Sequence, residues 1–100
     1  MEPAIEDLLA QVREQQQRIE EIQRSVATLE VTGYAGNGDV TVKLKGDGRF
    51  TEVTIDPQVL RRYDAHTLGQ LVLEAVNDGL AKLASASEAR YAPLLGEAQQ

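Results

Sequence analysis

The first third of the chain carries apolar residues at heptad spacing. The a and d positions of residues 3–29 are apolar except at Gln15, and they are Ile5, Leu8, Val12, Ile19, Ile22, Val26 and Leu29. This period predicts a helix, which would be roughly 40 Å long. A compact domain of this size has a radius of gyration of only about 13 Å, so we expect the helix to project or to pack along a partner. It is either a dimerising or ligand-gripping arm, or an ordinary amphipathic helix on its own sheet.

Residues 30–57 show the two-residue alternation of half-buried strands. Glycine-rich reversals at 36–38 and 46–48 divide this segment into three parts, which predicts an antiparallel meander. These reversals lack the spacing of phosphate-binding loops, so turn chemistry explains them better. Pro57 cannot donate a ladder hydrogen bond and should end the last strand. The apolar face of the second hairpin consists of Val40, Val42, Leu44, Val53 and Ile55.

A helical stripe of apolar residues returns over residues 64–90, with Asp64 as a suitable N-cap. The side chains expected to be buried there are Leu68, Leu71, Val72, Ala75, Val76, Leu80 and Leu83. Pro93 and Gly96 should end regular structure and leave residues 91–100 as a tail. The predicted class is α+β: one domain over residues 1–100, ordered α-β-β-β-α, with a three-stranded meander between two long helices.

Composition narrows the classes of function. The chain has no cysteine and one histidine, so it lacks the residues of a familiar zinc site or a cysteine nucleophile. Its serines and carboxylates show no catalytic spacing, and no apolar run approaches the ~18 residues of a membrane span. We therefore expect no enzyme, metal site, cofactor, small-molecule substrate or membrane partner. The net charge of −6 would be repelled by phosphate at long range.

The basic residues are the remaining candidates for binding. One group lies around the second hairpin, where it could contact phosphate or merely keep the sheet soluble: Lys43, Lys45, Arg49, Arg61 and Arg62. A second group lies on the two helices among acids, as phosphate contacts or as surface salt-bridge residues: Arg13, Arg18, Arg24, Lys82 and Arg90.

Four short motifs occur in a characteristic order. The chain reads GNGDVTV from Gly36, GDG from Gly46, VTIDP from Val53 and EAVND from Glu74, after a glutamine-rich heptad helix. Together they resemble the YbaB/EbfC family of small bacterial nucleoid-associated proteins, over nearly the whole chain.

The resemblance implies an intertwined homodimer with tweezer-like helical arms, located in the cytoplasm at the nucleoid. It implies binding to double-stranded DNA with little sequence preference, and neither cofactor nor catalysis. A dimer would cover the apolar hairpin face and part of the heptad seam. The interface candidates are therefore Val40, Val42, Leu44, Val53, Ile55, Ile19 and Ile22. The alternative is a dimeric protein-interaction scaffold of the same fold that has lost DNA binding, which acids lining the arms would favour.

Overall fold

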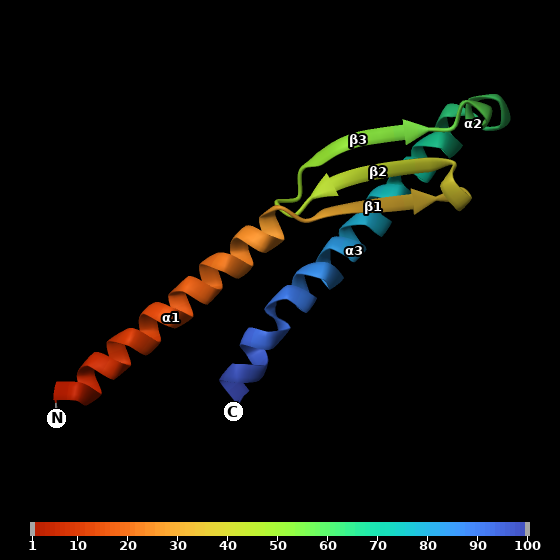
Figure 1. The fold of residues 1–100 in the computed structure, drawn as a ribbon. Helices are drawn as coiled ribbons and strands as arrows, with labels where there is room; N and C mark the ends of the chain where they lie inside the picture. Colours follow the sequence, from red (N-terminus) through yellow and green to blue (C-terminus); the bar gives the residue numbers. More distant parts are fainter. Residues whose placement is uncertain (1, 100) are drawn as a thin grey trace.

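A three-stranded sheet with one covering helix forms the body of the protein, and a second helix projects from one end of the body (Figure 1). The computed structural model describes the backbone of residues 2–99 and the side chains of residues 4–94. The molecule measures 75 × 23 × 16 Å, which confirms that the first helix projects. In chain order the elements are α1 (Glu2–Ala27), β1 (Glu30–Ala35), η1 (Gly36–Gly38), β2 (Val40–Lys45), β3 (Phe50–Ile55), α2 (Pro57–Arg62) and α3 (Ala65–Gln99).

The predicted antiparallel meander is confirmed, with strand order β1-β2-β3. Val42 lies opposite Gly33 on one side and Val53 on the other, so these three residues share one face of the sheet. The register shifts after Lys43, where β3 carries an extra residue. The η1 turn joins β1 to β2, and all three of its residues have positive φ, between 57° and 97°. Glycine adopts such angles without steric cost, which explains the composition of this turn.

The apolar side of the sheet is covered by α3, which packs against β1 and β2. Val40, Val42 and Leu44 are fully buried there, together with Ala75 of the helix. The helix and β1 approach closely because glycines meet: a Cβ on Gly33 would overlap the carbonyl oxygen of Ala75. The core is therefore complete over β1 and β2 within a single chain.

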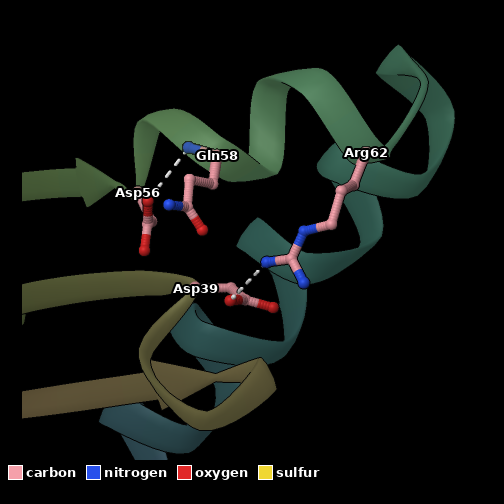
Figure 2. Close-up of polar contacts among 4 residues, drawn as sticks. All are labelled: Asp39, Asp56, Gln58 and Arg62. Carbon is pink, nitrogen blue, oxygen red and sulfur yellow. Dashed lines mark hydrogen bonds and ion pairs between the residues drawn. The ribbon is translucent and has the colours of Figure 1, made fainter.

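The α2 helix begins where β3 ends. The Asp56 carboxylate accepts a hydrogen bond of 2.9 Å from the backbone N–H of Gln58, and Pro57 occupies the first turn, where a missing N–H costs nothing (Figure 2). Asp64 caps α3 as predicted, because its carboxylate accepts a 2.8 Å bond from the N–H of Thr67. This bond lowers the pKa of Asp64.

Two expectations about the second long helix are wrong. The helix does not end near residue 90: α3 runs through Pro93 to Gln99, and of the expected tail only residue 100 lies outside the described residues. Proline removes one helical hydrogen bond, but its fixed φ is compatible with continuing the helix. Leu80 is also not buried, since 41% of it is exposed.

The α1 arm contacts the body only near its base. Ile22 lies beside Pro93 and Leu94 at the far part of α3, whereas Leu8 and Val12 are at least half exposed. The last turns of the heptad seam therefore pack against α3 of the same chain, while its first turns face solvent, and the dimerising role of the arm stays a prediction. Within the described residues, neither long helix is sufficiently apolar over a sufficient length to cross a membrane.

Candidate nucleic-acid interface

Among the described residues, Lys43, Arg62 and Lys82 form ion pairs with carboxylates. Lys43 Nζ lies 3.6 Å from Glu52 Oε2 across the β2–β3 pair. Lys82 Nζ lies 2.8 Å from Asp78 Oδ2 one helical turn away. Arg62 of α2 reaches Asp39 beside the η1 turn, with 3.4 Å between Nη2 and Oδ1 (Figure 2). These pairs are exposed and individually weak, but each one partly neutralises a base.

Lys82 has a structural environment that the sequence did not reveal. Its ammonium group also donates to the backbone carbonyl of Thr32 at 3.3 Å and lies 4.7 Å from the centre of the Tyr34 ring. Its ion pair is the main reason why the pKa of Asp78 is lowered, and a hydrogen bond from the N–H of Tyr34 contributes further. Lys82 is therefore placed to hold α3 on β1.

Four other bases gather where the arm meets the body, and we call this region the shoulder: Arg24, Lys45, Arg49 and Arg90. All four residues are exposed. Among the described residues, none of these four forms an ion pair with a carboxylate. The sequence separates them by up to 66 positions, so only the fold brings them into one region.

Backbone contacts place the hairpin turn against the arm. The N–H of Gly46 donates to the carbonyl oxygen of Leu29 at 2.9 Å, just beyond the end of α1. A Cβ on Gly46 would overlap the carbonyl oxygen of Val26, so only glycine fits this approach. The turn is closed by a 2.9 Å bond from the N–H of Lys45 to the carbonyl of Arg49. Lys45 and Arg49 therefore lie beside the last turn of α1, which carries Arg24.

The fourth shoulder residue arrives from α3. Arg90 Nη1 donates a hydrogen bond of 2.6 Å to Ser25 Oγ, which ties the far half of α3 to the base of α1. Two acids share the region: Glu30 pairs with Lys45 in the β1–β2 register, and the Asp47 carboxylate accepts the N–H of Arg49 at 2.9 Å. The region thus combines four bases with these two acids, while Glu20 and Glu21 lie one helical turn before Arg24 and Ser25 on α1.

The arm itself is acidic. Its side chains described beyond the shoulder include five acids, which occupy the b and c positions of the heptad: Glu6, Asp7, Glu14, Glu20 and Glu21. Arg13 and Arg18 are the bases of this part, and Arg61 on α2 is the remaining basic candidate, at the opposite end of the body. The candidate bases thus do not form one surface. Four of them lie together at the shoulder, and the others lie on separate parts of the molecule.

The interface candidates of the sheet also divide into two groups. Val40, Val42 and Leu44 are inaccessible to a second chain, because α3 of the same chain already covers them. Val53 remains 52% exposed on β3, and Ile55 is partly buried. On the arm, Ile22 is partly buried against α3, while Ile19 is 36% exposed.

Comparison with known proteins gives matches that extend over nearly the whole chain. A family model described as the YbaB/EbfC DNA-binding family matches residues 1–98. A nucleoid-associated protein of Mycobacterium sp. (strain KMS) is 41% identical over 95 residues, covering 95% of this chain and 86% of the relative. A nucleoid-associated protein of Corynebacterium diphtheriae is 37% identical over 93 residues, covering 93% of this chain and 88% of that protein.

The fold has a counterpart among solved structures. The crystal structure of the uncharacterised protein HP0035 from Helicobacter pylori superposes with a TM-score of 0.71, at 19% sequence identity. The match covers 88% of this chain and 92% of the other. At this identity the likeness concerns the fold alone.

Proposed function

Because the chain belongs to the YbaB/EbfC DNA-binding family, we propose that it is a nucleoid-associated protein that binds duplex DNA with little sequence specificity. The relatives that share more than a third of its residues carry the name nucleoid-associated protein, which supports action at the nucleoid in the cytoplasm. No catalytic role forms part of the proposal. DNA binding of this kind organises the chromosome and affects gene expression broadly.

The shoulder is the observation that carries the proposal. Its four bases are exposed and free of carboxylate partners within the described residues, so their charge is available to phosphate. Phosphate contacts depend on charge and position rather than on base identity, which accounts for weak sequence preference. The acids of the arm would lie away from the duplex if DNA rests against the shoulder.

A homodimer is the second element of the proposal. The protomer leaves Val53, Leu73 and Leu80 between 41% and 58% exposed next to its core. A second copy that covered them would bring two shoulders into one particle and double the number of phosphate contacts. Small domains commonly gain stability in this way.

Salt dependence of DNA binding tests the function. We would titrate the protein into labelled random duplex DNA at about 50 and 200 mM salt, where phosphate-driven affinity changes steeply. The double variant Lys45→Gln/Arg49→Gln should bind more weakly and lower the slope of log K against log salt by about 2 per protomer bound to DNA, because each protomer loses two contacts. The charge-matched control is Lys43→Gln/Arg62→Gln, whose bases are already ion-paired and whose slope should stay near that of the parent.

The acidic arm favours the alternative function, a protein-interaction scaffold of the same fold. If the folded parent protein fails to bind DNA even at low salt, DNA binding is refuted and the scaffold explains the chain better. If the two double variants weaken binding equally, the shoulder is not the contact surface.

A further inference from the structure

A side-chain hydrogen bond joins the two long helices at the shoulder. Arg90 Nη1 of α3 donates to Ser25 Oγ, in the last turn of α1, at 2.6 Å. Ser25 is half-buried, whereas Arg90 is exposed. A guanidinium group has five N–H donors in a fixed plane, so one donor can rest on the hydroxyl while the others stay available to a ligand. The bond therefore fixes the direction of this base and leaves it able to bind.

A competing acid lies one helical turn away. Glu21 and Ser25 are four residues apart on α1, so their Cβ atoms are about 5–6 Å apart on the same face of the helix. Glu21 also lines the cleft between α1 and α3 together with Pro93 and Leu94, which follow Arg90 by about one turn of α3. The Glu21 carboxylate is therefore within reach of an arginine side chain at position 90.

The guanidinium group of Arg90 is nevertheless bonded to the serine. Within the described residues, Arg90 and Glu21 form no ion pair. A neutral hydroxyl accepts a hydrogen bond without cancelling the positive charge, whereas a carboxylate would pair with the charge and partly neutralise it. The side chain at position 25 therefore decides whether Arg90 contributes a positive charge to the shoulder.

We propose that Ser25 is a positioning residue for DNA binding: its hydroxyl holds the Arg90 guanidinium group at the shoulder, away from Glu21, so that Arg90 contacts a phosphate of the duplex. This inference rests on the proposed function and names a residue that acts through another. The hydrogen bond also lowers the cost of association, because an arginine that is already held in place loses less rotamer freedom when it meets phosphate.

Replacement of the serine hydroxyl tests the positioning. Ser25→Ala removes the acceptor, so Arg90 can turn toward Glu21. In the duplex titration at about 50 and 200 mM salt, we expect weaker binding and a slope of log K against log salt that falls by up to about 0.9 per bound protomer, the contribution of one phosphate contact. Ser25→Thr keeps a hydroxyl group and should bind as the parent does. Ser85→Ala is the matched control and should also bind as the parent does, because the exposed Ser85 hydroxyl has no hydrogen-bond partner within the described residues.

Removal of the competing acid separates positioning from a purely structural role. The double variant Ser25→Ala/Glu21→Gln lacks the carboxylate that would capture Arg90, so its salt slope should return close to that of the parent. Glu20→Gln removes the same charge from the neighbouring position of α1 and is the charge-matched control. Combined with Ser25→Ala, it should leave the slope reduced. If Ser25 merely tied the two helices together, neither glutamine substitution would restore the slope.

Substitution of the arginine tests the phosphate contact itself. Arg90→Gln should lower the slope by about 0.9 per bound protomer, and adding Ser25→Ala should change it no further, because the hydroxyl then has no guanidinium group to hold. The glutamine amide can still donate a hydrogen bond to a hydroxyl, so this variant removes the charge with little change to the neighbouring packing. A urea midpoint close to that of the parent would show that each variant is folded.

The outcomes separate this inference from the function on which it rests. A parent protein that fails to bind DNA at low salt refutes the proposed function and the inference together. If the parent binds and Arg90→Gln keeps its slope, the phosphate contact of Arg90 is refuted while DNA binding stands. If Ser25→Ala keeps the slope of the parent, or if Glu21→Gln does not restore it, the positioning role of Ser25 is overturned.

Discussion

The contact between Gly33 and α3 offers the sharpest test of how this fold is held together. A Cβ added at Gly33 would overlap the carbonyl oxygen of Ala75 and lie 2.5 Å from the backbone nitrogen of Gly79. Both obstacles are backbone atoms and cannot rotate aside. To restore ordinary contact distances, α3 would have to move away from β1 by about 1 Å.

The expected change in the free energy of unfolding of Gly33→Ala is the difference between two opposed effects. Overpacking of this kind typically costs about 3 kcal/mol at its upper range. Alanine reduces the freedom of the unfolded chain relative to glycine and returns up to about 1 kcal/mol. We therefore expect Gly33→Ala to lower the free energy of unfolding by about 2 kcal/mol. In a domain of this size that corresponds to a melting temperature roughly 8–16 °C lower.

Urea denaturation followed by circular dichroism provides the measurement, at one fixed protein concentration because association contributes to stability. The control is Gly69→Ala in α3, where an added Cβ meets nothing within 4 Å. That variant should gain up to about 1 kcal/mol, since alanine is the better helix former. A Gly33→Ala protein as stable as its parent would refute the close backbone contact.

Two further predictions concern the Gly46 turn at the shoulder and the contact of Asp78 with β1. Gly46→Ala should lower the free energy of unfolding by about 2 kcal/mol in the same urea assay, because its Cβ would overlap the carbonyl of Val26; an unchanged midpoint would show that the turn does not rest on α1. The pKa of Asp78 lies below its ordinary value of 3.8, so its contribution to stability is present above that pH and is lost as pH falls through the folded pKa. Asp78→Asn should therefore be less stable than the parent at about pH 6, and this difference should shrink by about pH 3 when urea midpoints are compared; a constant difference would contradict the role of the charge.

The predictable parts of the structure depend on neighbours in sequence. The alternation of Val40, Val42 and Leu44 predicted the central strand, and Asp64 marked the start of α3, because both signals involve residues a few positions apart. The prediction that the helix ends before Pro93 was wrong, because a proline removes one hydrogen bond without forbidding helical φ.

No pattern among neighbouring residues predicted the shoulder or the contacts of Asp78 and Lys82 with β1. Tyr34 and Asp78 are 44 positions apart, and Ser25 and Arg90 are 65 apart. Each contact requires α3 to lie close to a distant segment of the chain, and Gly33 and Gly79 permit the close approach of α3 to β1. The sequence therefore named Lys82 and Arg90 as equivalent bases, while the fold ties one to the β1 edge and places the other at the shoulder.

The backbone bond between Gly46 and Leu29 is one of the contacts that hold the base of α1, a helix roughly 40 Å long. A long rigid rod on a short mount behaves as a lever: a tilt of about 10° at the mount would displace the far tip by about 7 Å, or about two base-pair steps of B-DNA. The direction of the arm therefore depends on the few contacts at its base, which are the glycine turn, the Arg90–Ser25 bond and the packing of Ile22 against α3. Substitutions at these contacts would change where the far tip of the arm lies relative to the sheet.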